Sequence, residues 1–514
     1  MKSVNNNSVK WLKKFSREKI IDNKNIVELL KYDQYSLWWF LEWLMEFGTF
    51  HFLDINSILH NPSQSTRYNK TASIFKFLRI FVRKIIWSWF RMFGTDEKRH
   101  YKKLVVFISD LHQLVYDTNK KKFVMDERFL PVINSIKNMD VAVLNLPYKK
   151  EAGFGAYDKG LSKNTLFFPI EHFMGISEFF KALKIFKIYK NTWKQIKASK
   201  SLDFMDLNIK KHIVNNFDYF FSGYLFLTLW EIEGYKSFTQ EFKPDLICTY
   251  DPFNPYGFKP RLAFKGKMLA IQYGFWGTPE SEYLHSKHDM HTYPLVDYAS
   301  VFDSKIKNNL VNISNFPRNK IFITNNPKAE DLSMKIKIFS LNIEENTILF
   351  LSQPFNDQKE FYFFLKEVFQ FFKQIPYEKK VIRPHPSETN IKIYKLLIKK
   401  YRIQNVYISN PIDEDIIFPL SKSKLVISCN STAIIEARLL GKPVILVDVW
   451  KKGYADFFQR IPSVQNSEGL MDFFHKFKKK SYNPNLNPSA YLNTARLIKK
   501  LTDEKYGIKT TAGN

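Results

Sequence analysis

The fold of this chain is decided by two segments, VIRPHPSE at residues 381–388 and LVISCNSTAIIEARLLGKPVILVD at residues 425–448. The apolar run Leu425–Ile427 is too short for a helix and predicts a buried strand. A polar turn follows, and Ala433–Leu440 predicts a helix that ends at a Gly-Lys-Pro sequence. The apolar run Val444–Val447 then predicts the next buried strand. The second segment is therefore a β–α–β unit with hydroxyl groups in its strand-to-helix turn.

The strand-to-helix turn carries groups that suit a phosphate. The first N–H groups of a helix lack intrahelical partners and lie at its positive end, and Ser431 and Thr432 add hydroxyl groups there. Glu436 lies one helical turn after Thr432, where its carboxylate could accept hydrogen bonds from a ribose diol. The alternatives are that either hydroxyl only caps the helix and that Glu436 only faces solvent.

His385 follows a short predicted strand, Lys380–Ile382, and stands between two prolines. This rigid loop could direct the imidazole or a backbone group toward the same phosphate, although a loop histidine without function is the alternative. Ligands of open parallel sheets bind beyond the carboxyl ends of the strands. The ordered set of polar residues on successive strand ends therefore favours a nucleotide site over separate structural roles.

These motifs resemble the donor half of GT-B glycosyltransferases, above all bacterial capsule and surface-polysaccharide transferases. Members that transfer sialic acid or Kdo carry a His-Pro motif and a later Ser/Thr motif around the CMP of the donor. CDP-glycerol glycerophosphotransferases have a similar Arg-x-His-Pro and serine turn. The resemblance extends over Lys243–Asp448 and is weak before it. It is carried by Arg383-Pro384-His385-Pro386, Ser428-x-x-Ser431-Thr432-x-x-x-Glu436 and Gly441-Lys442-Pro443.

The composition indicates a multidomain globular protein. A length of 514 residues predicts two or three domains, and 45% hydrophobic residues with 49 Phe and 26 Tyr exclude a disordered chain. Cys248 and Cys429 are expected to be buried free thiols, which suits a reducing cytoplasm. We find neither a signal-peptide core nor an apolar run of about 18 residues, so no transmembrane helix is expected.

The net charge of +28 is compatible with nucleic acid, an anionic membrane or an anionic substrate. Zinc-ligand spacing, an RNP-type aromatic box and a helix-turn-helix signature are all missing from the sequence, so no nucleic-acid partner is expected. The lysines are scattered, often beside isoleucine and asparagine, which an AT-rich genome would also produce.

Residues 1–100 predict a mostly helical region. Tyr35–Phe47 is an aromatic segment with Glu42 and Glu46 on one face, and it predicts an amphipathic helix packed on the protein or on a membrane. Lys76–Phe93 mixes basic and aromatic residues, which suits an anionic headgroup layer or packing on the first domain. We therefore expect a cytoplasmic protein with peripheral contact at the inner face of the membrane and a glycan or lipid-linked acceptor.

Residues 101–335 predict a first Rossmann-like domain that binds the acceptor. The basic helical region Phe173–Lys200 is expected to form an exposed face, potentially beside the acceptor. The predicted strands are Leu104–Ile108, Val141–Leu144, Asp245–Tyr250, Lys267–Gln272 and Ile321–Thr324. Polar side chains at their ends supply the general base that an inverting transfer needs. Asp110 is the first choice, His112 the second and Asp251 the third, with a helix N-cap as the alternative for Asp110.

Two further segments extend the resemblance. Ala270–Gly274 resembles the Gln-His-Gly of surface-polysaccharide transferases, with Gln272 kept and Tyr273 in place of histidine. Where that histidine is the base in relatives, this chain cannot use it, which disfavours glycerophosphotransfer. Phe316–Leu332 resembles a strand-Gly-Asn-Pro segment near the interdomain hinge, with Asn325 where glycine is usual.

Residues 336–480 predict the second Rossmann-like domain, which holds the donor, and residues 481–514 predict a helix and tail. The resemblance to GT-B proteins implies that this last helix crosses back to the first domain. The expected fold class is therefore α/β, with two Rossmann-like domains facing a cleft and a helical N-terminal extension. Asp413-Glu414-Asp415 more closely matches a helix start than a metal motif, so neither a catalytic metal nor a cofactor is expected.

The resulting hypothesis is a metal-independent glycosyltransferase of surface-polysaccharide synthesis. Ser431, Thr432 and helix N–H groups hold the donor phosphate, Arg383 and His385 assist the leaving group, and Glu436 holds the ribose. The resemblance favours a CMP-linked acidic sugar, with UDP- or GDP-sugars left open. Alternatives are CDP-glycerol phosphotransfer, nucleotide-sugar 2-epimerisation, a basic nucleic-acid-binding protein and a non-catalytic partner of a polysaccharide complex.

Overall fold

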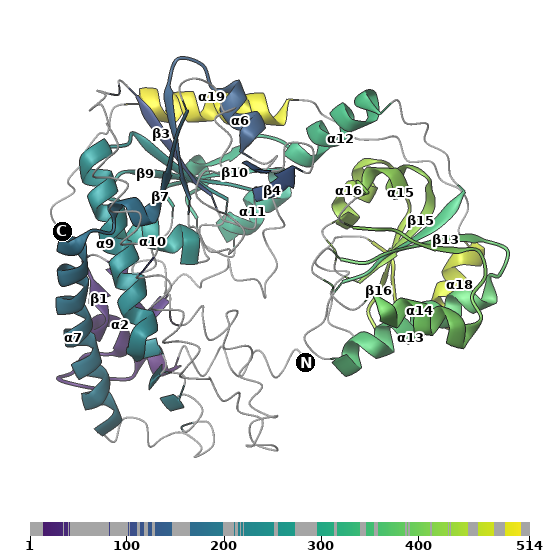
Figure 1. Ribbon diagram of the computed structural model, residues 1–514, viewed down its shortest axis with the longest axis horizontal. Helices are drawn as coiled ribbons and strands as arrows, with labels where there is room; N and C mark the ends of the chain where they lie inside the picture. The colour runs from purple at the N-terminus through teal and green to yellow at the C-terminus, as the bar shows by residue number, and fades with distance from the viewer. Residues whose placement is uncertain are drawn as a thin grey trace. The chain divides into compact units, whose positions relative to one another are not determined.

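The computed structural model of the protein divides into two compact units (Figure 1). The first unit holds the described residues up to Gln272, those from Val296 to Ile323 and those from Leu492 onward. The second unit holds Thr324–Tyr491. The described residues are 14–33, 35–39, 41, 82, 101, 103–109, 114–117, 122–125, 129–145, 165–198, 210, 214–215, 217–218, 220–250, 255–272, 296–312, 316–339, 346–353, 358–385, 388, 391–411, 414–429, 431, 433–450, 461–476 and 489–504.

The first unit is built on a seven-stranded parallel sheet in the order β11-β10-β9-β8-β3-β6-β7. In chain order this is the arrangement 3-2-1-4-5-6-7, which is the doubly wound arrangement of nucleotide-binding folds. Its point of strand-order reversal lies between β3 and β8. The strands are β3 (Leu104–Ser109), β6 (Asp140–Asn145), β7 (Thr165–Pro169), β8 (Leu246–Thr249), β9 (Lys267–Ile271), β10 (Tyr298–Val301) and β11 (Ile321–Ile323).

Helices and short elements complete the first unit. α7 and α9 pack against each other, and α9 also contacts α10. The helices are α2 (Ile26–Leu29), α6 (Leu130–Ser135), α7 (Ile176–Ala198), α9 (Leu225–Phe242), α10 (Pro255–Ala263), α11 (Ser304–Asn312) and most of α19 (Ala490–Asp503), with single turns at η3 (Ile170–Phe173), η5 (Phe220–Tyr224) and η6 (Arg318–Lys320). Two antiparallel hairpins pair β1 (Lys31–Tyr32) with β2 (Tyr35–Ser36) and β4 (Leu114–Asp117) with β5 (Lys122–Met125).

The aromatic N-terminal segment is part of the core of the first unit. Trp38 is fully buried and lies edge-on to Phe217, with ring centroids 6.2 Å apart. The Tyr189 hydroxyl on α7 donates to the carbonyl of Lys31 at 2.7 Å. The predicted helix over Tyr35–Phe47 is wrong at its start, because Tyr35 pairs with Tyr32 in the hairpin. The rest of that segment beyond residue 41, and Lys76–Phe93 apart from residue 82, lie outside the described residues.

The second unit is built on a six-stranded parallel sheet in the order β14-β13-β12-β15-β16-β17. In chain order this is 3-2-1-4-5-6, so the order reverses between β12 and β15. The strands are β12 (Thr347–Leu351), β13 (Lys379–Arg383), β14 (Val406–Ile408), β15 (Ser423–Ser428), β16 (Val444–Val447) and β17 (Ser463–Val464). The helices are α12 (Pro327–Ile338), α13 (Gln358–Gln374), α14 (Lys392–Tyr401), α15 (Ile417–Ser421), α16 (Ala433–Leu439), α18 (Ser467–Lys476) and the first turn of α19.

Helices cover both faces of this second sheet (Figure 1). Alternate residues of one strand point to opposite faces. Phe350 of β12 therefore joins the core beneath α13, α14 and α18, whereas Leu351 joins the core beneath α15 and α16. This two-sided burial explains the continuous apolar runs in the sequence. The predicted fold class of two Rossmann-like α/β domains is confirmed, and the predicted boundary at residue 336 falls inside α12.

Two residues with positive φ fix the local chain direction. Gly441 has φ of 72° just after α16, and its N–H donates to the carbonyl of Arg438 while that of Lys442 donates to Ala437. This is the Schellman pattern that favours glycine. Asn325, where the resemblance leads us to expect glycine, has φ of 71°. Asparagine tolerates this left-handed conformation better than other side chains do, so the exchange preserves the backbone shape.

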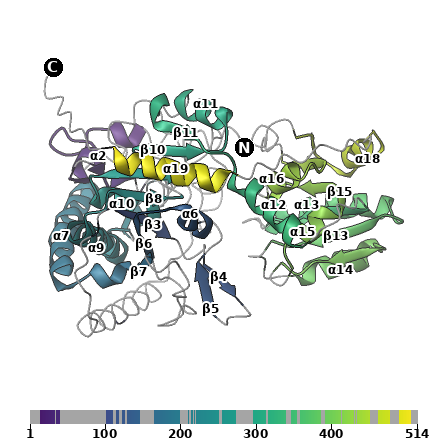
Figure 2. The same cartoon turned by 90° about the horizontal axis from the view of Figure 1, so that it is seen from above.

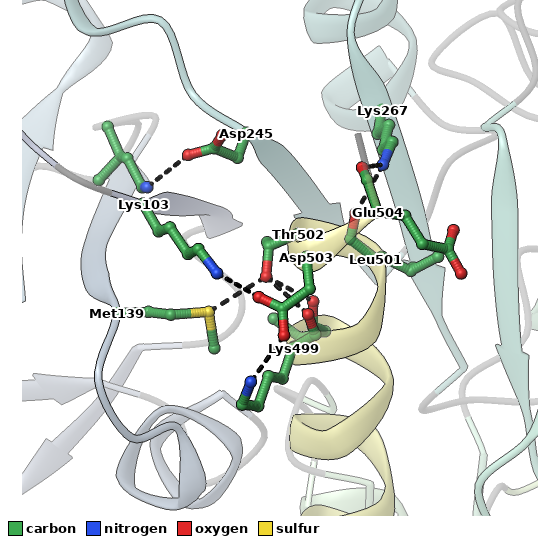
Figure 3. Close-up of polar contacts among 11 residues, drawn as sticks. Lys103, Met139, Asp245, Lys267, Lys499, Leu501, Thr502, Asp503 and Glu504 are labelled. Carbon is green, nitrogen blue, oxygen red and sulfur yellow. Dashed lines mark hydrogen bonds and ion pairs between the residues drawn. The ribbon is translucent and has the colours of Figure 1, made fainter. Parts of the chain in front are cut away.

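The last helix docks on the first unit, as predicted for the tail (Figure 3). Lys267, at the start of β9, donates to the carbonyls of Leu501, at 2.7 Å, and Glu504. These carbonyls lie at the negative end of α19, which a lysine ammonium stabilises. Lys103 forms an ion pair with Asp503, and together with Lys499 it lowers the pKa of Asp503 to about 2. The amino edge of the sheet thus holds the C-terminal end of the helix.

We predict that Lys267→Met loosens α19. The substitution keeps an aliphatic stem but removes two hydrogen bonds from a charged donor to helix-end carbonyls, a loss of about 1–3 kcal/mol. Amides of residues 492–503 should exchange faster with deuterium, measured by mass spectrometry. Lys305→Met, at an exposed position of α11 in the same unit, is the matched control. Equal exchange in both variants would contradict this account.

Candidate functional site

The candidate site lies at the carboxyl edge of the second sheet, where the strand order reverses. Leu351 at the end of β12 is paired with Arg383 at the end of β13, so these two strands finish at the same level. On the other side, the buried Ser428 hydroxyl of β15 donates to the Leu351 carbonyl at 2.9 Å. This bond joins the strands on either side of the reversal. We predicted that Ser428 binds the donor. In the structure its hydroxyl is hydrogen-bonded to a backbone carbonyl of the neighbouring strand.

Ser431 lies in the turn between β15 and α16. Its side chain is nearly buried, and its Oγ accepts a hydrogen bond from the N–H of Ala433 at 3.3 Å. Such a bond is the local capping role that we considered as the alternative to phosphate binding. A hydroxyl that accepts one bond keeps its hydrogen for another partner, so the two roles are compatible. Thr432 lies outside the described residues.

A partly buried network holds the loop that carries His385. The N–H of His385 donates to Glu388 Oε1 at 2.9 Å, and the Glu388 N–H donates to the His385 carbonyl at 2.9 Å. The other oxygen of Glu388 is bonded to the hydroxyl of Tyr394 on α14. That hydroxyl lies 2.6 Å from the Oγ of Ser352, which follows β12. The network therefore ties the His385 loop to the end of the central strand.

The charge states in this network follow from burial. Desolvation raises the pKa of Tyr394 well above its usual value, and the Glu388 charge adds to this rise, so the hydroxyl stays protonated and donates to Glu388. Burial lowers the pKa of His385, and the negative charge of Glu388 partly opposes that shift. His385 is therefore neutral at pH 7. A bound anion next to the imidazole would favour its protonated form.

Arg383 is turned toward a neighbouring loop. Its side chain is almost completely buried, and Glu414 Oε2 lies 3.7 Å from its guanidinium. The guanidinium donates to Ser409 Oγ at 2.6 Å and to the carbonyls of Asn410 at 3.0 Å, Pro411 at 3.4 Å and Glu414 at 2.5 Å. We predicted that Arg383 assists the leaving group. The structure engages its donors with the loop after β14, so Arg383 shapes the edge of the site.

Glu436 has a partner that we did not predict. Lys328, at the start of α12, donates to Glu436 Oε1 at 2.8 Å, and both side chains are largely buried. The side chain of Asn326 accepts from the Lys328 N–H at 3.0 Å, which fixes the start of α12. The ion pair holds one carboxylate oxygen of Glu436. The other oxygen remains the atom for the predicted bond to a ribose hydroxyl.

The acceptor-side predictions fall on the first unit. Gln272 is buried directly after β9, and its Oε1 accepts from the N–H of Phe302 at 2.9 Å. Its side chain therefore supports the chain after β10. The other base and acceptor-side candidates lie outside the described residues: Asp110, His112, Asp251 and Tyr273.

The sequence reasoning missed the residues that position the site. Glu388 was within the quoted motif, and its spacing of three from His385 is a local signal for a bond to the backbone. Tyr394 and Lys328 gave no local signal, because their partners depend on how helices pack on the strands. Within the described ranges, no cluster of three or more His, Cys, Asp or Glu side chains could hold a metal ion. Metal independence remains a prediction.

The buried position of Arg383 generates a stability prediction. Arg383→Lys should lower the free energy of unfolding by about 2–4 kcal/mol, because one ammonium cannot replace a guanidinium fork and leaves buried carbonyls without donors. Denaturant unfolding followed by tryptophan fluorescence measures the change. Arg402→Lys, at an exposed position of the same unit, should have little effect. If Arg383→Lys is as stable as this control, the guanidinium of Arg383 does not stabilise the loop after β14.

The candidate site lies within the part of the chain that a protein-family model matches. The model of the alpha-2,8-polysialyltransferase family matches residues 247–448. This span contains every donor-side residue that we predicted, from Arg383 to Glu436. No curated protein sequence matches the chain.

Solved structures of similar fold include nucleotide-sugar enzymes. UDP-GlcNAc 2-epimerase from Methanocaldococcus jannaschii is 13% identical with a TM-score of 0.46, and that from Neisseria meningitidis bound to UDP-GlcNAc is 15% identical with a TM-score of 0.46. MurG from Acinetobacter baumannii is 12% identical with a TM-score of 0.43. Each alignment covers 77% of this chain and 99% of the other.

The family match confirms the resemblance that the motifs indicated. It extends from β8 in the first unit to the end of β16 in the second, and it includes the strand ends described above. Residues 247–448, which lie in both units, match the polysialyltransferase family model, and this match supports a glycosyltransferase of the capsule-polysaccharide kind.

Proposed function

We propose that this glycosyltransferase transfers an acidic sugar from a CMP-linked donor to a glycan acceptor. The observation that carries this proposal is the polysialyltransferase-family match over residues 247–448, which include the carboxyl edge of the second sheet. Sialic acid, which the family name specifies, is an acidic sugar. The His-Pro and Ser/Thr motifs resemble those around the CMP of the donor in sialic acid- and Kdo-transferring families. The positive net charge of +28 suits an anionic donor and an anionic acceptor.

The proposed donor site uses the strand ends at the reversal point of the second unit. Ser431 and Thr432 hold the phosphate, and Glu436, fixed by Lys328, accepts from the ribose. His385 hydrogen-bonds the phosphate as the bond between the anomeric carbon and the phosphate oxygen breaks. CMP leaves with that electron pair, and uptake of negative charge by fixed donors lowers the barrier.

The acceptor hydroxyl attacks the anomeric carbon and forms the new glycosidic bond. In an inverting transfer its proton goes to a general base. Asp110 stays our first candidate, followed by His112 and Asp251, and Gln272 and Tyr273 are candidates for shaping the acceptor side. The bond from the N–H of Phe302 to Gln272 Oε1 supports a positioning role for Gln272.

We propose a location at the inner face of the cytoplasmic membrane. A lipid-linked or membrane-tethered glycan acceptor would be presented there. In the part of the chain that the structure describes, no helix is both long and apolar enough to cross a membrane. The proposed association is therefore peripheral.

A nucleotide screen tests the donor class. CMP should raise the Tm of the purified protein more than CDP, UDP, GDP or ADP, since a ligand at about 100 times its Kd stabilises by about 2.7 kcal/mol. Ser431→Ala should remove most of this shift. Ser423→Ala, at the opposite end of the same strand, should change the baseline Tm but keep the shift.

The other outcomes of this screen identify different enzymes. A selective response to CDP would replace sugar transfer by glycerophosphotransfer. A response to UDP or GDP would replace the acidic sugar by another hexose. The absence of any response would overturn the proposed donor site.

The lowered pKa of His385 predicts how binding depends on pH. The neutral imidazole gains a proton when an anion binds beside it, so its pKa is higher in the complex than in the free protein. Below about pH 6.5, the affinity of wild type for CMP relative to His385→Asn should rise as pH falls. His475→Asn, at an exposed position of α18, should follow wild type. A constant affinity ratio across this range would exclude proton uptake by His385.

A further inference from the structure

Helix α7 presents a mixed basic and apolar face to solvent. Its buried side packs on the first unit through Ala182, Tyr189, Trp193 and Ile196. Trp193 stacks on Phe221 with ring centroids 5.4 Å apart. The opposite side of α7 is open, and Figures 1 and 2 show this helix on the outer side of α9. We call this side the exposed α7 face; it is formed by Ile176, Phe180, Lys181, Lys184, Lys187, Ile188, Lys190 and Lys194.

The apolar side chains on the exposed α7 face are largely accessible to solvent. Ile176 is 78% exposed, Phe180 61% and Ile188 55%. With 1.5 Å of rise per residue they span about 18 Å of the helix. Large apolar side chains repeated on one helix face, rather than scattered singly, indicate a surface that contacts an apolar partner.

The same face carries almost uncompensated positive charge. Glu178 is the only acidic residue of α7, and it lies 3.7 Å from Lys181. Among the described residues, Lys184, Lys187 and Lys194 form no ion pair. These three ammonium groups therefore lie beside the open isoleucine and phenylalanine side chains without an acidic partner.

We propose that the exposed α7 face is the surface by which this protein lies on an anionic lipid bilayer. The apolar side chains enter the boundary between headgroups and acyl chains, and the lysines contact the lipid phosphates. Interfacial helices have this combination of apolar side chains and flanking lysines. The proposal specifies the surface for the peripheral location suggested above, and it does not depend on the identity of the donor.

An acidic glycan is the other anionic partner that this charge suits. A hydrated polyanion would attract the lysines but would gain little from open Ile176, Phe180 and Ile188. Burial of these side chains removes apolar area from water only when the partner has an apolar layer. The side chains of the face therefore favour lipid over glycan.

Vesicle binding of the full chain tests the proposal. We would compare co-sedimentation with phosphatidylglycerol–phosphatidylcholine vesicles and with phosphatidylcholine alone. The triple variant Lys184→Glu, Lys187→Glu and Lys194→Glu should lose about a hundredfold in affinity for the anionic vesicles, since each lysine contributes about fivefold. Phe180→Ser should weaken binding without changing the charge.

The matched control places the same charge change on another helix. Lys392, Lys395 and Lys399 are exposed on α14 of the second unit, and their triple change to glutamate alters the net charge equally. This control should keep most of its vesicle binding. Equal losses in both triple variants would show a general charge effect and overturn the proposal.

Two further results separate lipid binding from glycan binding and show whether the variants fold. If the α7 variants keep vesicle binding but lose binding to a soluble acidic polysaccharide, the surface takes glycan and the lipid proposal is wrong. The CMP-induced rise in Tm, which depends on the second unit, should persist in the α7 variants and reports that they fold. A loss of vesicle binding with that shift retained supports the α7 surface, whereas failure of the CMP shift in wild type concerns only the donor proposal.

Discussion

The hydrogen bond from the Ser428 hydroxyl to the Leu351 carbonyl is the contact on which the candidate site depends. It joins β12 and β15 at the point where the strand order of the sheet reverses. Ligands of doubly wound sheets bind at that point because the connections on either side leave space there. Ser428 is completely buried, so without the Leu351 carbonyl its hydroxyl would be an unpaired donor in the core. The turn that carries Ser431 starts from this fixed position.

Around this contact, polar residues hold one another in place through hydrogen bonds and an ion pair. Ser352, Tyr394 and Glu388 hold the His385 loop from behind, and Lys328 holds Glu436. Buried carboxylates are costly unless they have donors, so each carboxylate in this region has a defined orientation. In the proposed transfer, such preorganisation would stabilise the leaving phosphate without a rearrangement at the moment of reaction.

The sequence predicted the parts of the fold that local patterns determine. Val444–Val447 was predicted with the observed bounds, because two-sided burial gives a continuous apolar run. Thr165–Pro169 and Tyr298–Val301 were not predicted as strands. The first ends in proline and the second contains alanine and serine, so neither has the strong β-branched composition that identified the others.

Side-chain partners were harder to predict than strands. Gln272, expected at the acceptor, bonds to the backbone of Phe302, which is 30 residues away. Glu436 pairs with Lys328 across 108 residues. No periodicity encodes such contacts, because they arise only when separate helices and strands pack. By contrast, one backbone angle explains why asparagine can stand at residue 325, where the resemblance led us to expect glycine. This difference does not by itself indicate a degenerate protein.

The central claim is that the second unit presents a CMP-sugar for transfer. Its most direct test is the product formed from CMP-activated sialic acid and a sialylated oligosaccharide acceptor, measured by mass spectrometry. The account predicts release of CMP and an acceptor heavier by one or more sialic acid residues, with both lost in Ser431→Ala. Donor converted without any change in acceptor mass, or a product carrying glycerol phosphate from CDP-glycerol, would contradict it.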